Sequence, residues 1–433
     1  MSPLCAALLA LSLTAPAPKS AAATDDWPQW RGPNRDGHSP STGLLKSWPA
    51  DGPKVLWKSD KLGAGYGSVA VAGDKLVVLG AEDDKEGTKE FALCLNPADG
   101  KQVWRTPIET ASGKYLYQWG SGPRSTPTID GDFVYVLGAK GDLLCLKLGD
   151  GKPVWAKNLV TDLGGGVPTW GYSESVLIDG DRLICTPGGQ KGTIASLDKR
   201  TGDVRWRSTD LRDPAGYSSV VITDAGGTKQ YVTQTMQSVC SVRADDGKLL
   251  WRKADIGYRI AVIPTPVIYQ DYVFVTAGYQ AGCELLKLSK DGDGVKADKV
   301  YTGKAIANHH GGVIRVGEHI YGHCELANHW VCLPFLKSKD GEEPKPEWTS
   351  KKLEKGSITY ADGLLFCYGE RTGDLAAIEA TPKDWKEVGR LKLPEKSKLE
   401  RRMGQIWPHP VVAHGKLWLR DHEMLFCFDL TGK

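Results

Sequence analysis

The sequence predicts an all-β protein, a closed eight-bladed β-propeller with four-stranded antiparallel blades. Three observations predict it. A tryptophan that follows a glycine-containing turn recurs every 41 to 51 residues along most of the chain. Each period contains four short segments that alternate apolar and polar residues, and a single orphan strand stands near the amino end. Repeats of this length built from four strands are typical of propellers.

The repeat is clearest in residues 125–155. STPTI is the first predicted strand, FVYVLG the second, LLCLKL the third and PVW the fourth, with tight Asp-Gly turns at Asp130 and Asp150. Strands rich in β-branched and aromatic residues, separated by such turns, indicate antiparallel hairpins. No periodicity of 3.6 residues appears, which excludes a helical solenoid.

The recurring tryptophans predict where each fourth strand lies. They are Trp57, Trp104, Trp155, Trp206, Trp251 and Trp348, and the series continues in degenerate form at Tyr301 and Gly389. An indole on the outermost strand can wedge between adjacent blades while its N–H reaches a backbone carbonyl. We therefore interpret these tryptophans as structural.

The two ends of the repeat region predict how the ring closes. Residues 407–433 supply three strands without a fourth, whereas Val55-Leu56-Trp57 is a fourth strand with no first three before it. If residues 55–57 complete the last blade, the ring has eight blades and no exposed sheet edge. We expect this strand to pair with the strand that contains Cys427.

The first 53 residues precede the repeats and divide into two segments. Residues 1–23 resemble a signal peptide, because Leu4 to Leu13 is an apolar run too short to span a bilayer and Ala21-Ala22-Ala23 offers a cleavage site. Residues 24–53 are a leader that we expect to cap the propeller, and residues 54–433 are the propeller itself. No membrane span is predicted, so the protein is expected in the periplasm or outside the cell.

Five of the ten cysteines share one strand position in successive repeats: Cys94, Cys145, Cys240, Cys332 and Cys427. A small residue repeated at one position indicates a packing choice, because free cysteine behaves as a small hydrophobe. Equivalent positions in neighbouring blades are also too far apart for a disulfide. We expect these thiols to be reduced and buried.

The charges of the chain give no support for binding to nucleic acid or to a membrane surface. It has 55 basic and 52 acidic residues, a net charge of +3, and no basic block or stripe. A nucleic-acid partner is therefore not expected.

The direction of the strands predicts which face carries a site. Tight turns share one face, here called the tight-turn face, and the longer connections between second and third strands and between blades share the other, the loop face. Eight of the nine histidines lie between His309 and His422, mostly near the loop face. The predicted ligand-binding residues at the channel mouth are Arg124, Tyr172, Glu174, Tyr217, His309, His310, His323, Glu325, Arg371, Trp407, His409, Arg420 and His422.

Two interpretations of this cluster stay open. It is a polar pocket for a small molecule, glycan, peptide or metal, or it satisfies the backbone of long loops and holds channel water. No metal-ligand spacing is visible, so no metal site is predicted, and no catalytic residue can be named.

The segment Ala195 to Trp206 matches the AxxDxxTGxxxW motif and resembles pyrroloquinoline-quinone (PQQ) repeats. That family includes the quinoprotein alcohol dehydrogenases and the outer-membrane assembly lipoprotein BamB, and the resemblance covers about residues 54–433. The leader segment from Trp27 to Gly37 looks like that of BamB-like exported proteins of planctomycete-type bacteria.

The resemblance implies two functions. One is a BamB-like scaffold of the cell envelope that binds partner proteins or a small ligand; the other is a quinoprotein oxidoreductase that uses PQQ with Ca²⁺. The dehydrogenases hold the quinone against a vicinal Cys-Cys disulfide, and no two cysteines are adjacent here. We therefore expect the scaffold, without a cofactor, and keep the enzyme as the alternative.

Overall fold

The computed structural model describes residues 25–84, 87–108, 115–254, 260–336 and 341–432. The predicted signal peptide, residues 1–23, lies outside the described residues. Within the described part the only helical element is a single 3-10 turn, η1 (Ala225–Gly227). No helix in this part is long and apolar enough to span a membrane.

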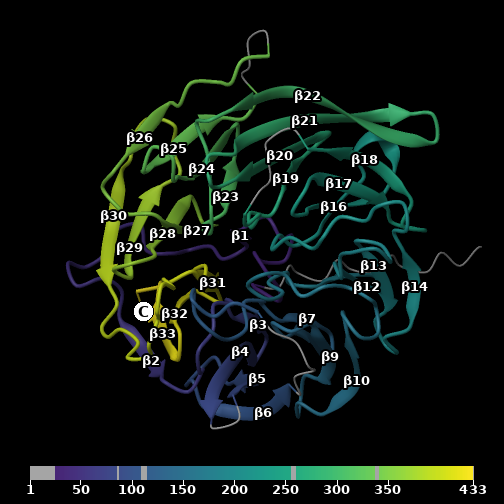
Figure 1. Cartoon of the computed structure of the whole chain (residues 1–433). Coiled ribbons are helices and arrows are strands. Elements are labelled where there is room, and N and C mark those ends of the chain that lie inside the picture. The colour runs from purple at the N-terminus through teal and green to yellow at the C-terminus, as the bar shows by residue number, and fades with distance from the viewer. Residues whose placement is uncertain (1–24, 85–86, 109–114, 255–259, 337–340, 433) are drawn as a thin grey trace, which may run out of the picture.

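The strands form eight four-stranded antiparallel sheets arranged as blades around a central axis (Figure 1). Blades 1 to 4 consist of β3 (Ala70–Ala72), β4 (Lys75–Asp84), β5 (Gly87–Leu95) and β6 (Gln102–Ile108); β7 (Thr128–Asp130), β8 (Phe133–Leu137), β9 (Asp142–Lys147) and β10 (Pro153–Asn158); β11 (Leu177–Asp179), β12 (Arg182–Cys185), β13 (Ala195–Asp198) and β14 (Val204–Arg207); and β15 (Val221–Thr223), β16 (Gln230–Gln234), β17 (Val239–Arg243) and β18 (Leu249–Lys253).

The remaining blades complete the ring. Blades 5 to 8 consist of β19 (Val267–Tyr269), β20 (Tyr272–Ala277), β21 (Gly282–Asp291) and β22 (Gly294–Gly303); β23 (Val313–Val316), β24 (His319–Cys324), β25 (His329–Pro334) and β26 (Trp348–Ser350); β27 (Gly356–Ala361), β28 (Leu364–Gly369), β29 (Asp374–Glu379) and β30 (Glu387–Lys392); and β31 (Val411–Ala413), β32 (Lys416–Asp421) and β33 (Met424–Asp429) with β2 (Val55–Ser59). In blade 7, β1 (His38–Ser39) adds a short parallel strand on the inner side of β27.

The ring closes as the sequence predicts. Strand β2 pairs antiparallel with β33, and Trp57 lies opposite Cys427. The buried apolar side chains form eight clusters, one between each pair of neighbouring blades, including one between blades 8 and 1. The prediction of an eight-bladed propeller closed by an amino-terminal strand is confirmed.

The fourth-strand tryptophans wedge between blades. The indole N–H groups of Trp57, Trp104, Trp155 and Trp206 donate to the carbonyls of Pro97, Leu148, Lys199 and Ala244 in the next blade, at 2.8 to 3.1 Å. Each of these rings also lies against the glycine of a tight turn; a Cβ on Gly247, whose φ is +74°, would stand 2.3 Å from the ring of Trp206. The turn glycine thus supplies both the left-handed backbone and the space for the indole.

The repeated cysteines are buried and free, as the repeat predicts, and all nine cysteines of the described residues are unpaired. Cys94, Cys145, Cys332 and Cys427 each lie directly opposite the tryptophan of their own blade. A small side chain at this position leaves room for the neighbouring indole.

The leader enters the central channel from the tight-turn face. Trp27 exchanges two backbone hydrogen bonds with Val71, and Asp26 contacts His414 in the first turn of blade 8. The chain then crosses the axis, visible in purple near the centre of Figure 1, and His38 pairs with Tyr360 of β27. Two buried guanidinium groups anchor it: Arg31 donates to Val313 O at 2.6 Å and Arg35 to Ser175 O at 2.5 Å.

Candidate ligand pocket on the loop face

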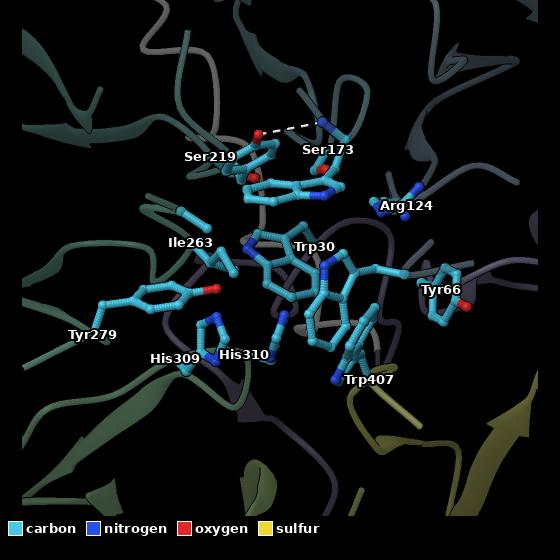
Figure 2. A pocket seen from close by; sticks show the side chains of 14 residues that line it. Trp30, Tyr66, Arg124, Ser173, Ser219, Ile263, Tyr279, His309, His310 and Trp407 are labelled. Carbon is cyan, nitrogen blue, oxygen red and sulfur yellow. Dashed lines mark hydrogen bonds between the residues drawn. The ribbon is translucent and has the colours of Figure 1, made fainter. Parts of the chain in front are cut away.

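The loop-face mouth of the channel contains a pocket that encloses about 870 Å³, its open mouth included. Segments that enter the first strands of several blades form its walls, and the leader contributes Trp30 from below (Figure 2). The lining residues are Trp30, Tyr66, Trp119, Arg124, Trp170, Ser173, Tyr217, Ser219, Ala261, Ile263, Tyr279, His309, His310 and Trp407.

The indole of Trp30 forms the floor of this pocket. Its N–H donates to Thr265 Oγ1 at 2.9 Å, and its ring meets the buried imidazole of His409 edge-on, with ring centres 4.6 Å apart. Trp30 therefore contacts segments that lead into blades 5 and 8 from beneath the pocket.

The walls are largely aromatic. Trp407 stacks on His310 with ring centres 4.2 Å apart and an angle of 13° between the planes. Tyr66 lies against Trp407 at 4.8 Å and 38°, and Trp170 lies against Tyr217 at 5.8 Å and 43°. Apart from the stacked pair, neighbouring rings are inclined to each other and together form a bowl.

Arg124 supplies the only formal charge among the lining residues, which include no carboxylate. Its two terminal nitrogens donate to Gly122 O and Gly120 O, each at 3.0 Å, and its guanidinium carbon lies 5.1 Å from the centre of the Tyr66 ring. Within the described ranges no ion pair joins Arg124 to an acidic side chain. Backbone carbonyls thus orient the guanidinium group and leave its charge uncompensated by a direct partner.

A charged network lies behind the histidine wall. His309 Nδ1 is 3.1 Å from Glu325 Oε2, and Lys355 Nζ is 3.2 Å from Glu370 Oε1. Burial opposes ionisation of Glu325, but its hydrogen bond with His309 and the charge of Lys355 hold its pKa below the usual value. Burial, together with Lys355, lowers the pKa of His309, and burial lowers that of His310 well below its usual value. Both imidazoles are therefore neutral at pH 7.

The structure brings some of the predicted site residues together and separates others. Lining the pocket are Arg124, Tyr217, His309, His310 and Trp407. Glu325 and His409 contact lining residues from behind, through His309 and Trp30. His422 lies edge-on to Tyr66 at 4.9 Å, and the buried Arg420 donates to the carbonyls of Gly67 and His422.

Four predicted residues lie away from the pocket. Tyr172 and Glu174 are not at the channel mouth, where they were predicted. Tyr172 is buried between blades 2 and 3 and donates to Pro187 O, and Glu174 accepts from Thr186 N at 2.5 Å. His323 is buried against Trp330. Arg371 is exposed and pairs with Glu354 at 2.8 Å. Side chains on alternate positions of a strand point to opposite faces, so a residue near the axis need not face it.

Several lining residues were not among the predicted site residues, above all Trp30, Tyr66, Trp119, Trp170 and Tyr279. A signal for four of the lining residues was present in the sequence. Trp30, Trp119, Trp170 and Trp407 are tryptophans that do not occupy the fourth-strand position of any repeat. Tryptophans outside the fourth-strand position of the repeats were therefore better indicators of the pocket than histidines were.

The residues present do not fit PQQ held with Ca²⁺. Ca²⁺ prefers several oxygen ligands, usually carboxylates, and none lines the pocket. Across the described residues no group of three or more histidine, cysteine or acidic side chains could hold a metal ion. The nine cysteines that the structure describes offer no vicinal pair to form a stacking wall.

Comparison with solved structures identifies proteins that share this fold. BamB from Moraxella catarrhalis aligns with a TM-score of 0.56 and 12% identity, over 85% of this chain and 95% of that one. The quinohemoprotein alcohol dehydrogenase from Comamonas testosteroni aligns with a TM-score of 0.65 and 11% identity, over 95% of this chain and 82% of that one. At these identities the likeness concerns the fold alone.

Sequence comparison points to one family. The outer membrane protein assembly factor BamB of Kangiella koreensis is 23% identical over 219 residues, which cover 49% of this chain and 48% of the relative. BamB of Yersinia pestis is 22% identical over 289 residues, which cover 54% of this chain and 67% of that relative. The chain thus spans about half the length of the first relative. A family model described as outer membrane protein assembly factor BamB matches residues 88–342. The chain therefore belongs to the PQQ-repeat family of the outer membrane protein assembly factor BamB.

Proposed function

We propose that this protein is an exported scaffold of the cell envelope that docks partner proteins on its loop face. The distribution of exposed apolar side chains carries the proposal. Contiguous patches of exposed apolar side chains mark surfaces for protein association.

The exposed large apolar side chains of the described residues occur in two places only. Five belong to the outermost strands β2, β6, β10 and β14, spread around the rim: Val55, Leu56, Val103, Val154 and Val204. The other six all lie in loop-face connections: Leu116, Ile260, Tyr279, Leu326, Leu399 and Met403. In the described ranges the tight-turn face has none.

The connection between β30 and β31 adds a basic character to this face. Lys396, Lys398 and Arg402 are exposed there beside Leu399 and Met403, which are 41% and 53% exposed. Met403 N donates to Gln118 O, so this segment is tied to the connection between blades 1 and 2. A partner segment with apolar and acidic side chains complements such a surface.

The family supports the same function. Its relatives are named as outer membrane protein assembly factors. Because the matched region covers about half of the first relative, the assembly role and the identity of the partner are part of the proposal. Location in the periplasm or outside the cell follows from the predicted signal peptide and is likewise proposed.

Site-specific photo-cross-linking in the native envelope tests the docking face. A photoreactive residue at Leu399 or Met403 should give one discrete adduct with an envelope protein. The same residue at Val103 or Val154, which are 45% and 41% exposed on the rim, is the matched control and should give none. Binding of the purified partner should then weaken at least 10-fold in Leu399→Glu and stay unchanged in Val103→Glu. Equal cross-linking from both places, or no loss in Leu399→Glu, would refute docking on the loop face.

A further inference from the structure

We propose that the aromatic pocket binds a carbohydrate ring that carries one anionic group, such as a sugar acid. This inference goes beyond partner docking and does not depend on it, because it concerns the aromatic bowl that lies beneath the docking face. Three properties of the bowl support it: the inclination of its aromatic walls, the neutral polar groups between them, and the single cation.

The inclination of the walls favours a saturated ring. A flat ligand can lie parallel to only one of two rings that are inclined to each other, so it would stack on one wall at a time. Here Tyr66 and Trp407 are inclined by 38° and Trp170 and Tyr217 by 43°, while the parallel faces of Trp407 and His310 already cover each other. A sugar ring has C–H groups that point outward from both faces, so it can contact two inclined aromatic faces at once.

Neutral polar groups alternate with the indoles. Hydroxyl groups of Ser173, Ser219, Tyr217 and Tyr279 belong to the lining. Beside the pocket, the ring nitrogens of four lining residues are buried and make no hydrogen bond with a described residue: Trp170 Nε1, Trp407 Nε1, His309 Nε2 and His310 Nδ1. Leaving such groups unpaired costs about 1 to 3 kcal/mol each. Apolar faces with polar groups between them match the apolar faces and hydroxyl edge of a sugar.

The charge of the lining selects an anionic ligand over a cationic one. The guanidinium of Arg124 is oriented by two backbone carbonyls, and no carboxylate lines the pocket. His309 and His310 are neutral at pH 7, because burial lowers their pKa values. A carboxylate on the ligand would form a charge-assisted hydrogen bond with Arg124, whereas an ammonium group would find no counter-charge.

Calorimetric titration of the purified full chain tests the ligand class. The probes are D-glucuronate, D-galacturonate and N-acetylneuraminate, with D-glucose, D-glucosamine and benzoate as comparisons. At least one sugar acid should bind, glucose should bind about 10- to 100-fold more weakly, as expected for the loss of one charged hydrogen bond, and glucosamine should not bind. Tighter binding of benzoate than of every sugar acid, or no binding of any sugar acid at 10 mM, would overturn the proposal.

Variants locate the site. Arg124→Gln should reduce the affinity for the sugar acid to that for glucose, while Arg124→Lys should retain part of it. Arg212→Gln changes an exposed loop-face arginine outside the lining and is the control. Trp170→Leu should abolish binding of both sugars and remove the ligand-dependent change in tryptophan fluorescence. Unchanged affinity in Arg124→Gln and Trp170→Leu, with thermal midpoints at the wild-type value, would place binding elsewhere and refute the pocket.

A final comparison separates a free sugar acid from the end of a glycan. A disaccharide of the same acid should bind at least as tightly as the monosaccharide if the ligand is a chain end, because the pocket opens to the loop face. Either result is compatible with the class of ligand proposed here. Since no partner protein is present in these titrations, failure of partner docking leaves their outcome unaffected.

Discussion

The indole of Trp48, in the leader, occupies the space beside Gly389 in β30. A Cβ on Gly389 would lie 2.3 Å from Trp48 Cγ, and Trp48 N donates to Val388 O at 3.1 Å. Trp48 belongs to the apolar cluster between blades 7 and 8. At the other blade boundaries the fourth strand supplies the aromatic ring itself, so the leader replaces the one that blade 7 lacks.

This relationship predicts strong coupling between the two positions. Trp48→Ala should destabilise the protein by about 3 to 5 kcal/mol, because it empties a buried site. Gly389→Ala should cost about 1 to 3 kcal/mol through overpacking. In denaturant unfolding, the double variant should be clearly more stable than the sum of the two losses predicts. Additive losses would contradict the contact.

The buried cysteines should react slowly in the native protein. Burial raises the pKa of Cys94, Cys332 and Cys427 to about 12 and that of Cys145 to about 11, so almost no thiolate forms at pH 8. Labelling followed by peptide mapping should show slow modification at these positions and at Cys240, and rapid modification after denaturation. Recovery of any of them as a disulfide from freshly purified protein would overturn the packing argument.

Protonation of buried His323 should destabilise the protein in acid. Burial, with the charges of Lys355 and His329, lowers its pKa to about 3 from 6.5. The unfolded state therefore binds a proton that the folded state refuses as pH falls from about 6.5 to 3, and stability is lost over that window. The difference in unfolding free energy between His323→Leu and the wild type should shift by about 2 kcal/mol in favour of the variant when the pH is lowered from 7.5 to 5. If the difference in unfolding free energy between variant and wild type is the same at both pH values, His323 is not the cause of the loss of stability in acid.

Addition of PQQ and Ca²⁺ should leave the thermal midpoint unchanged. The lining has no carboxylate for Ca²⁺ and no vicinal disulfide against which the quinone could stack. A ligand at 100 times its dissociation constant would add about 2.7 kcal/mol of stability. An upward shift that disappears in His309→Ala or Arg124→Ala would instead support the quinoprotein oxidoreductase.

The candidate site was only partly predictable. Arg124, Tyr217, His309, His310 and Trp407 were placed at the mouth because each lies just before a first strand or its blade crossover, and the structure shows them lining the pocket. His323 and Arg420 were included for their charge and position, yet both are buried. Which side of a strand or loop a side chain faces depends on register and on neighbouring blades, which local sequence does not specify.

The sequence by itself determined the blade. Asp-Gly turns, alternating strands, the fourth-strand tryptophan and the cysteine beside it are local features that repeat. The number of blades and a closing strand at Val55 to Trp57 could therefore be inferred from spacing alone, and the observed strand is Val55–Ser59. The tertiary structure alone decided the path of the leader and hence the pocket. Trp30 and Trp48 lie outside every repeat, and their partners, His409 and Gly389, are more than 300 residues away in the sequence. Such contacts exist only once the ring has closed, because closure brings the first and last blades together around the leader.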